Sequence, residues 1–392
     1  MQPWLLEFLA CPCCRVGALR VDRRDEVCFV DPVNRLEEVL VTGILHCANC
    51  QEDFPVLEES PRLLPPSQMS REERAHVTGT AGRPRIGGAA IQRSATDLDR
   101  LIEQAIRDDY GHPASGPGLR RLQQDLAYQR RYESSRIYQM AWLRRALAAD
   151  PRVIVDVGGG RGGNLHAARS AMSFEYGIVA DLNPRWPPMF QCGARRLAYI
   201  RADATRLPLR ERCADLVISS FLLEHVKDWR TVVDEVARVG KAAFIAFGPN
   251  RSFPVEFGHL DAPLAHSLPP ALGAAAAYLW GRVSGDRRSY GRYAEILGGM
   301  SYISSREYYR FCRSRAIPCR SVFDHILREW ATGGSSGMRA FLGRRPGLTG
   351  RLARFFHRLH LEPNIYSLIG SSPPVAPDNP PAEIGHAAFP TD

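Results

Sequence analysis

The chain has 392 residues, 45% of them hydrophobic and 24% charged, which is the balance of a soluble globular protein with room for more than one domain. No apolar run reaches 18 residues and the N-terminus lacks a basic leader, so we expect a cytoplasmic protein without a membrane span. The net charge of +9 would suit a nucleic-acid partner, but residues 1–66 hold eleven acidic residues against six arginines, which disfavours a nucleic-acid clamp there.

Two cysteine pairs with C-x-x-C spacing, Cys11/Cys14 and Cys47/Cys50, lie in this first part of the chain. Each pair can supply two thiolates to a tetrahedral zinc ion, and four sulfur ligands leave no open position for catalysis. Cys13 competes with Cys14, but the two-residue spacing favours Cys14. We therefore expect a structural zinc site formed by Cys11, Cys14, Cys47 and Cys50. Reduced cysteines without a metal are the alternative, and redox activity is a third interpretation.

The strings LLEFLACPCC and GILHCANCQEDFPVLEESPRLLPP cover most of residues 1–66. They resemble the small zinc-ribbon activator proteins of tRNA methyltransferases. The resemblance implies a small zinc-ribbon β domain over residues 1–66 that would act as an activator or scaffold in cis. An insert around residues 22–38 lengthens the segment between the two cysteine pairs.

The next segment, residues 67–95, is polar and rich in Gly, Arg and Ser, which predicts a flexible linker. From residue 97 to residue 150 the pattern becomes helical.

A short strand, a run of glycines and a helix start follow one another in residues 151–164, PRVIVDVGGGRGGN. Glycines let the backbone approach a ligand closely, and the N–H groups at a helix start favour negative charge. The loop has no Lys-Ser/Thr after its glycines, so it is not a phosphate-binding P-loop. It carries Asp156 at the strand end instead.

Further hydrophobic runs alternate with helical stretches at Tyr176–Ala180, Arg195–Ala202, Leu216–Ser220 and Ala242–Phe247. Such alternation predicts a doubly wound parallel sheet, in which ligands bind at the carboxyl ends of the strands. Two later runs, IPCRSVF and NIYSLIGS, are expected to be strands six and seven.

The pattern Asp156-x-Gly-x-Gly-x-Gly, with Asp181 and Asp203 after the next two strands, resembles class I S-adenosylmethionine-dependent methyltransferases of the type 11 kind. The resemblance implies an α/β, Rossmann-like sheet of seven strands over residues 96–370, closed by a hairpin. It places the glycine loop at the methionine part of the cofactor, Asp181 at the ribose, and Asp203 with Ala204 at the adenine. In this family a helix before the first strand can also cover the cofactor, so Tyr128 and Tyr132 are candidates for contacting its methionine carboxylate. A turn or N-cap role is the alternative for Asp203. The cofactor-binding candidates are Asp156, Gly158, Gly160, Gly162, Asp181, Asp203, Ala204 and Ser219.

The residues after the fourth strand bear on the acceptor. Enzymes of this family that methylate amide or base amino groups commonly carry Asn/Asp-Pro-Pro-aromatic there, whereas this chain has Ser-Ser-Phe-Leu at residues 219–222. Imidazole and carboxylate groups near this edge can act as a general base. The catalytic candidates are His225, Glu256 and His259, and Asn250, Asp261 and His266 are further substrate-site candidates in the same loop. Capping and packing are the alternative roles.

Three peripheral segments complete the organisation. Residues 250–300 are expected to form a lid that includes a helix at residues 272–280. An insert at residues 324–363 is basic and partly amphipathic, and it is a candidate for contact with a phosphate-bearing or membrane-surface substrate. The tail at residues 371–392 is expected to be disordered.

The sequence therefore predicts a methyltransferase that uses S-adenosylmethionine, contains a structural zinc and acts on a small-molecule, lipid-linked or glycan-type acceptor. An RNA methyltransferase with an N-terminal zinc module is one alternative. A non-catalytic scaffold that binds S-adenosylmethionine is another. A nicotinamide dehydrogenase is disfavoured because Asp156 lies in the loop that would face phosphates. The oligomeric state stays open.

Overall fold

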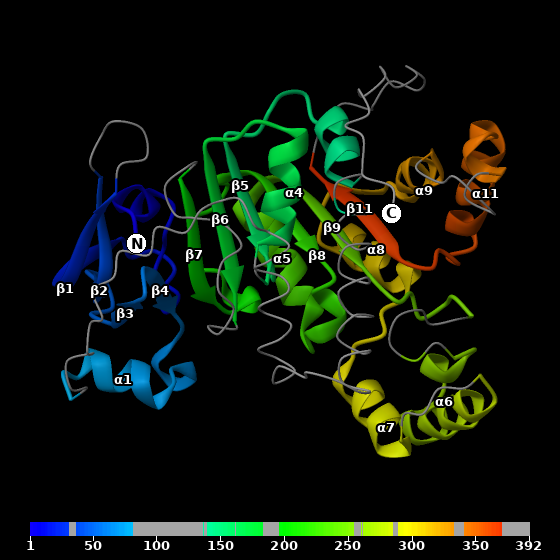
Figure 1. The fold of residues 1–392 in the computed structure, drawn as a ribbon, viewed down its shortest axis with the longest axis horizontal. Coiled ribbons are helices and arrows are strands. Elements are labelled where there is room, and N and C mark those ends of the chain that lie inside the picture. Colours follow the sequence, from blue (N-terminus) through cyan, green and yellow to red (C-terminus); the bar gives the residue numbers. More distant parts are fainter. Residues whose placement is uncertain are drawn as a thin grey trace, which may run out of the picture.

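The computed structural model describes residues 1–30, 37–80, 136, 139–160, 162–182, 196–254, 260, 262–284, 289–332 and 341–370. One sheet of eleven strands runs through the whole described molecule, in the order β1-β2-β3-β4-β7-β6-β5-β8-β9-β11-β10. The N-terminal strands form one end of the molecule, and helices α6, α9 and α11 lie towards the other end (Figure 1).

The larger part of this sheet is the predicted doubly wound unit. Its parallel strands are β5 (Val153–Val157), β6 (Tyr176–Asp181), β7 (Leu197–Ala202), β8 (Ala214–Ser220) and β9 (Gly240–Phe247). β11 (Ile365–Ile369) pairs antiparallel with β9, and β10 (Cys319–Ser321) pairs antiparallel with β11. The predicted fold class, including the closing hairpin, is confirmed.

The first part of the chain adds four strands to the same sheet. β1 (Leu19–Val30), β2 (Glu37–Cys47), β3 (Asp53–Leu57) and β4 (Ser60–Leu63) form an antiparallel meander. β4 then pairs parallel with β7, through Arg62 opposite Arg201 and Leu63 opposite Ala202. The small module is therefore joined to the larger unit by backbone hydrogen bonds, and the β7 edge is not left exposed.

The two faces of the sheet are covered by different helices. α5 (Trp229–Val239) packs with Val153, Val155 and Val157 of β5 on one face, and α4 (Gly163–Ala171) packs with Ile154 on the other. This alternation follows from the period of two along a strand.

The first helical turn, η1 (Pro3–Glu7), belongs to the α5 face as well. Its Trp4 ring lies 4.9 Å from the ring of Tyr176, between the ring centroids. The small module and the larger unit thus share one hydrophobic core.

Part of the segment expected as a linker is structured. Pro66–Gln68 form η2, and Arg71–Val77 form α1, which begins at Ser70 with a capping box. The Ser70 side chain accepts from the N–H of Glu73, and the Glu73 carboxylate accepts from the N–H of Ser70. Buried Glu73 also forms an ion pair with Arg201 of β7. The linker expectation was wrong for these residues, and its remainder from residue 81 lies outside the described residues.

The end of the molecule away from the small module is mostly helical. It contains α6 (Pro270–Ser284), α7 (Tyr290–Gly299), α8 (Ser305–Ser314), α9 (Phe323–Thr332) and α11 (Pro346–Arg358). α8 begins at Ser304, whose side chain accepts from the N–H of Glu307, as the sequence indicates. Within the described ranges, no helix is both long enough and apolar enough to cross a membrane. The expected tail at residues 371–392 lies outside them.

Candidate functional site

The glycine loop connects β5 to α4 at the carboxyl edge of the sheet. Gly158, Gly160 and Gly162 have φ values of 67°, 56° and 90°, a left-handed conformation that residues with a Cβ rarely adopt. Gly162 is the N-cap of α4, so the helix begins directly at the end of the loop. The loop can therefore present backbone N–H groups to a ligand.

Asp156 lies beneath this loop and is fully buried. Its Oδ1 accepts a hydrogen bond of 2.9 Å from Nδ2 of Asn164 in α4, and its Oδ2 has no hydrogen-bond partner among the described residues. Burial raises the pKa of Asp156 to about 7, and the Asn164 bond and the positive charge of Arg136 offset part of that rise. The Cβ of an alanine at position 159 would lie 2.4 Å from the carboxylate, so only glycine fits there.

Arg136 lies beside the glycine loop, and it is not among the residues that the sequence motifs predict for the site. A Cβ at Gly163 would lie 2.2 Å from its Nη1, so the guanidinium rests against the start of α4. Arg136 is helical and belongs to the segment before β5. That segment contains several arginines, and no sequence pattern distinguishes Arg136 from the others. Arg136 places a positive charge beside the glycine loop. The sequence suggested Tyr128 and Tyr132 as contacts of the methionine carboxylate. Both lie outside the described residues.

Asp181 ends β6, the strand next to β5. Its Oδ2 accepts a hydrogen bond of 2.9 Å from the N–H of Gly160. Because β5 and β6 are parallel neighbours, the acid after the second strand reaches the loop after the first. The structure thus brings together the glycine loop and Asp181, as the sequence predicts.

Asp203 follows the third strand, β7, and is the N-cap of the short helix η3 (Ala204–Arg206). Its Oδ1 accepts from the N–H and Oγ1 of Thr205, at 2.8 and 2.7 Å. Its Oδ2 accepts a hydrogen bond of 3.3 Å from Nε2 of Gln68, which comes from the small module. Asp203 therefore has the capping role considered as its alternative, and its carboxylate remains half-buried at the carboxyl edge.

The end of β8 carries buried hydroxyl groups and a buried acid. Ser219 and Ser220 end the strand, and neither Oγ has a hydrogen-bond partner among the described residues. Glu224 lies in the following turn, η4 (Leu223–His225), is 1% exposed, and both of its carboxylate oxygens likewise lack such a partner. Since buried polar groups normally have a partner, the gathering of such atoms at one strand end indicates a place for a ligand.

Glu224 lies between the ends of β8 and β9. Burial raises its pKa to about 8. The backbone N–H groups of Glu224 itself and of Gly248, just after β9, lie near enough to offset part of this rise, although neither makes a hydrogen bond of normal geometry with the carboxylate. The adjacent Leu222 faces the glycine loop, because a Cβ at Gly158 would lie 2.7 Å from its Cδ1. The sequence pattern does not reveal which of Glu224 and His225 is buried.

The sequence-predicted catalytic residues have different outcomes. His225 is exposed on η4, while its neighbour Glu224 occupies the buried position. Glu256 and His259 lie outside the described residues, and so does Asp261. His266, by contrast, is among the described residues and is buried, and its ring centroid lies 5.5 Å from that of Tyr302.

Asn250 has a structural role, which corrects its proposal as a substrate contact. Its Nδ2 donates to the carbonyl oxygens of His360 and Glu362 at 3.0 and 2.8 Å. Its Oδ1 accepts from the N–H groups of Ser252 and Ser305 at 3.1 and 3.2 Å. The bonds to His360, Glu362 and Ser305 fasten the loop after β9 to the segment before β11 and to α8.

The four predicted cysteines form one cluster in the small module. The Sγ atoms of Cys11, Cys14, Cys47 and Cys50 all lie within 4.8 Å of one another. Cys11 to Cys50 is 3.5 Å and Cys14 to Cys47 is 3.7 Å between sulfurs. A tetrahedron with Zn–S bonds of about 2.3 Å has sulfur–sulfur edges of about 3.8 Å, so the cluster fits zinc.

The backbone around the cluster supports the same interpretation. The N–H of Cys13 donates to Sγ of Cys11 and the N–H of Gly17 donates to Sγ of Cys14, both at 3.3 Å. A Cβ at Gly17 would lie 2.2 Å from Sγ of Cys47, so glycine is required beside the sulfurs. Cys14, not Cys13, belongs to the four, as the spacing predicts.

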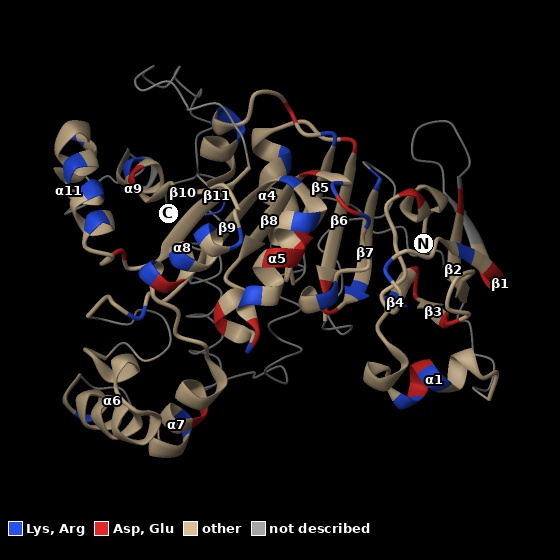
Figure 2. Ribbon diagram, turned by 180° about the vertical axis from the view of Figure 1, so that it is seen from behind, with Lys and Arg blue, Asp and Glu red and all other residues tan. Residues whose placement is uncertain are grey.

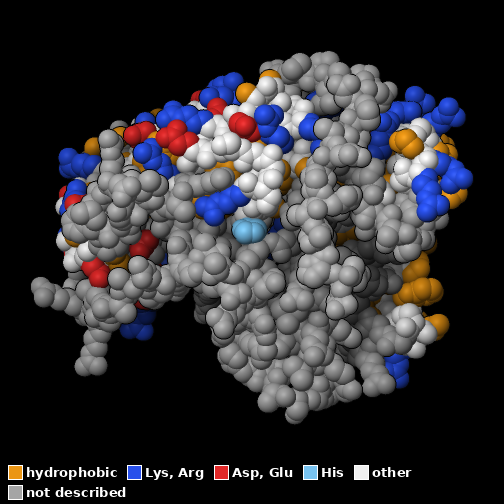
Figure 3. Space-filling model, turned by 45° about the horizontal axis from the view of Figure 1, so that its top comes forward, with side chains coloured by type: hydrophobic (Ala, Val, Ile, Leu, Met, Phe, Trp, Pro, Cys, Tyr) orange, Lys and Arg blue, Asp and Glu red, His pale blue; other side chains and the backbone are white. Residues whose placement is uncertain are grey.

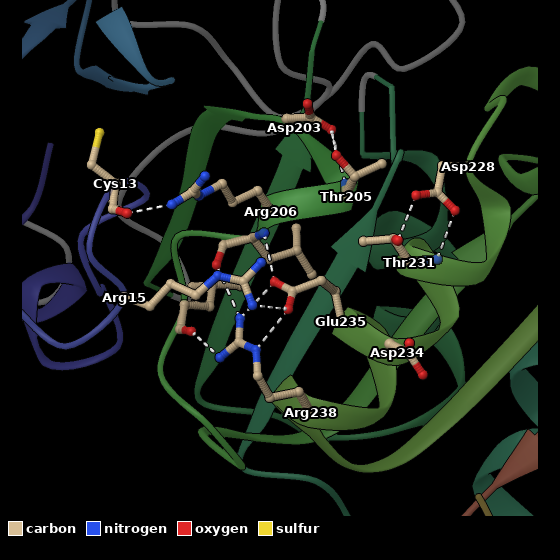
Figure 4. Close-up of polar contacts among 12 residues, drawn as sticks. Cys13, Arg15, Asp203, Thr205, Arg206, Asp228, Thr231, Asp234, Glu235 and Arg238 are labelled. Carbon is tan, nitrogen blue, oxygen red and sulfur yellow. Dashed lines mark hydrogen bonds and ion pairs between the residues drawn. The ribbon is translucent and has the colours of Figure 1, made fainter. Parts of the chain in front are cut away.

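The first cysteine knuckle contacts the turn that follows Asp203 (Figure 4). Arg206 of η3 donates a hydrogen bond to the carbonyl oxygen of Cys13. Glu235 of α5 accepts from the N–H of Leu207 at 2.8 Å, and its Oε1 lies 3.1 Å from Nη1 of Arg15. The turn from Asp203 to Leu207 is therefore held between the cysteine knuckle and α5.

Comparisons with known proteins agree with this geometry. Residues 155–243 match the sequence family described as methyltransferase domain. A malonyl-[acyl-carrier protein] O-methyltransferase of Nitrosospira multiformis is 31% identical over 106 residues, covering 24% of this chain and 32% of that protein. An uncharacterized methyltransferase of Mycobacterium sp. strain JLS is 34% identical over 140 residues, covering 35% of this chain and 52% of that protein. The chain thus spans between a third and about half the length of these curated relatives.

Two solved structures are similar in part. A complex of the Haloferax volcanii Trm112 methyltransferase activator with a methyltransferase aligns with 70% of this chain and 97% of that chain, at 16% identity and a TM-score of 0.33. The plantazolicin methyltransferase BpumL with S-adenosylhomocysteine aligns over the same shares, at 12% identity and a TM-score of 0.37. Residues 155–243 thus match a methyltransferase domain in sequence, and they contain most of the parallel strands and the glycine loop of the doubly wound unit. A four-cysteine module precedes them.

Proposed function

We propose that the chain transfers a methyl group from S-adenosylmethionine to a small-molecule, lipid-linked or glycan-type acceptor. The observation that carries the proposal is the hydrogen bond between the Asp181 carboxylate and the N–H of Gly160. It joins the acid after the second strand to the glycine loop after the first, and Asp203 follows at the end of the next strand. Three acids and a glycine loop at one edge are what the resemblance to class I enzymes requires.

The residues at this edge fit the three parts of the cofactor. Asp181 would accept hydrogen bonds from the ribose hydroxyls, and Asp203 with Ala204 would contact the adenine. The glycine loop would accommodate the methionine part. The positive charge of Arg136 beside Gly163 suits the methionine carboxylate. The glycine loop has no room for a side chain at position 159, since a Cβ there would lie 2.4 Å from the Asp156 carboxylate.

S-adenosylmethionine, when bound, supplies an electrophilic methyl group on a positively charged sulfur. The chain's own contribution is to position the acceptor and to exclude water. Ser219 and Ser220 are buried at the end of β8, where an acceptor hydroxyl or amine would approach. Successive residues of a strand point to opposite faces, so one of the two Oγ atoms would then make with the acceptor a hydrogen bond that no described residue offers it.

Glu224 is proposed as the group that takes the proton from the acceptor, in place of the exposed His225. Its carboxylate is buried, lacks a described partner and lies beside the loop through Leu222. A pKa of about 8 makes it a stronger base than an ordinary carboxylate once it is ionised. This role applies to acceptors that arrive protonated, such as a hydroxyl.

The four-cysteine module is proposed to bind a structural zinc ion and to support the cofactor site in cis. The supporting contacts are those of Arg206 with Cys13 and of Gln68 with Asp203. Both reach the turn proposed to bind adenine. Because they come from residues separated by more than a hundred positions, they depend on the module being folded.

The cofactor assignment is tested by calorimetric titration with S-adenosylhomocysteine. The wild-type chain is expected to bind, and Asp181→Ala is expected to weaken binding by about 10- to 150-fold, the effect of losing charged hydrogen bonds. Asp234→Ala is the control, because Asp234 is an acid on α5 that pairs with Arg315 away from the loop. Equal affinities for the two variants would refute the assignment.

The acceptor class is tested by incubating the protein with radiolabelled S-adenosylmethionine and fractionated cell extract. Label in the lipid, glycan or small-metabolite fraction is expected. Label in the RNA fraction would favour the RNA alternative. Cofactor binding without label in any fraction would favour the non-catalytic scaffold.

A further inference from the structure

Helix α11 exposes a continuous apolar stripe. Leu348, Leu352, Phe355 and Leu359 are each between 37% and 57% exposed. Their spacing of i, i+4, i+7 and i+11 places them on one side of the helix. The opposite side packs against α9 and contains the buried residues Thr349, Gly350 and Ala353. The helix therefore has one face that holds it to the protein and a second apolar face directed to solvent.

The same helix is strongly basic. Arg351, Arg354 and Arg358 are exposed alongside the stripe, and Arg344 and Arg345 precede the helix. No Asp or Glu occurs between Glu329 and Glu362. Among the described residues, no carboxylate forms an ion pair with any of these five arginines. Figure 2 shows the basic residues along α11 without acidic residues between them.

Helix α6 repeats the pattern at the same end of the molecule. Leu272, Leu279 and Val283 are more than 60% exposed and share one side of the helix, and Trp280 is 44% exposed beside them. α6 contains Arg282 and no acidic residue. Both helices lie at the end away from the four-cysteine module (Figure 1). Figure 3 shows hydrophobic and basic side chains gathered along that side of the molecule.

We propose that α11, with α6 as a second contact, docks the protein on the surface of a membrane that contains anionic lipids. An exposed apolar stripe beside arginines is the composition of an interfacial helix, whose apolar side chains enter the headgroup region while its basic side chains meet lipid phosphates. The charge of α11 is complementary to such a surface. The apolar stripe distinguishes it from a nucleic-acid surface, which would need the arginines but not exposed Leu and Phe.

This docking goes beyond the proposed function and does not depend on it. α11 is fixed to the sheet through α9, which contacts β11, so the membrane would lie against a rigid end of the domain. If the chain is an enzyme, docking would give it access to apolar acceptors in the bilayer. If the chain is a non-catalytic scaffold, it would still bind vesicles.

The experiment is co-sedimentation of the full chain with vesicles of phosphatidylcholine alone and of phosphatidylcholine with 30–40% phosphatidylglycerol. Binding to the anionic vesicles that weakens with salt is expected. Each arginine near an anionic surface contributes about fivefold in binding, so the triple variant R351Q/R354Q/R358Q should bind on the order of 100-fold more weakly. The variant L352S/F355S should also lose binding, because it removes apolar contact without changing the charge.

The control variant R20Q/R71Q/R212Q removes the same charge from exposed positions outside α11 and should bind vesicles like the wild type. S-adenosylhomocysteine affinity and thermal unfolding of each variant report whether it is folded. Equal losses of vesicle binding in the control and in the α11 triple variant would refute the proposal. Wild-type protein that does not bind anionic vesicles would refute it too. A dimer in solution that L352S/F355S dissociates, or RNA binding lost in the arginine variant, would assign the surface to those partners instead.

Discussion

The guanidinium of Arg15, the residue after the first cysteine knuckle, lies 3.1 Å from the buried carboxylate of Glu235 on α5. Glu235 also accepts from Arg238 at 2.8 and 2.9 Å and from the N–H of Leu207. One carboxylate therefore connects the cysteine module, the helix beneath the sheet and the turn that carries Asp203.

Replacing Glu235 with Ala should lower the free energy of unfolding by about 3 kcal/mol, because it removes the buried carboxylate that pairs with Arg238 and leaves the Leu207 N–H without its acceptor. The measurement is urea denaturation. Asp234→Ala on the same helix removes an exposed ion pair with Arg315 and should cost less than about 1 kcal/mol. Similar losses of unfolding free energy in both variants would show that Glu235 does not connect the cysteine module, α5 and the Asp203 turn.

The purified protein should contain one zinc ion per chain by mass spectrometry. Cys47→Ser should lose the metal, because four thiolates are needed to close the site, and should unfold at lower temperature. S-adenosylhomocysteine affinity should fall as well, since the carbonyl of Cys13 holds Arg206 next to Asp203. Cys13→Ser should keep the zinc, because its sulfur is outside the cluster. Loss of zinc from the Cys13 variant would contradict the assignment.

Two glycines offer a matched test of the loop. Gly159→Ala places a Cβ 2.4 Å from Oδ2 of Asp156 and should reduce cofactor affinity more than about tenfold, because the loop must shift. Gly298→Ala, in α7, meets no atom within 4 Å and should stabilise the protein by about 0.5–1 kcal/mol. Calorimetry and thermal unfolding distinguish the two effects. An unchanged affinity in the Gly159 variant would place the ligand elsewhere.

Glu224 should make stability fall as pH rises. Its pKa is about 8 in the folded protein against an ordinary value of 4.5, so between these values the unfolded chain has released a proton that the folded chain retains. The free energy of unfolding then decreases by up to about 1.4 kcal/mol per pH unit. Glu224→Gln removes this loss, so its melting temperature should exceed that of the wild type at pH 8 and approach it near pH 5.

The same variant tests the proposed proton transfer. Wild-type kcat/KM for a hydroxyl acceptor should rise with pH and level off above about 8, as Glu224 ionises. Glu224→Gln should lose turnover while keeping its affinity for S-adenosylhomocysteine. His225→Gln, which changes the exposed neighbour, should keep turnover. The opposite result would return the role of general base to His225.

The sequence by itself determined the strands of the doubly wound unit and the residues that follow them. The β-branched runs, the glycine loop and the acids after successive strands are local patterns, and the structure places the loop and the acids at the carboxyl ends of parallel strands. The cysteine spacing likewise identified four sulfurs that the structure brings within 4.8 Å. The capping box at Ser70 was also readable, but the polar composition around it suggested a linker.

Only the tertiary structure decided how these parts meet. The pairing of β4 with β7 joins the module to the sheet, and it depends on an edge strand more than a hundred residues away. Tertiary packing buries Glu224 and leaves its neighbour His225 exposed, and it places Asn250 where its side chain is fully hydrogen-bonded to backbone groups. These outcomes depend on what packs around each side chain, and contacts between residues far apart in the chain leave no periodic pattern in a single sequence.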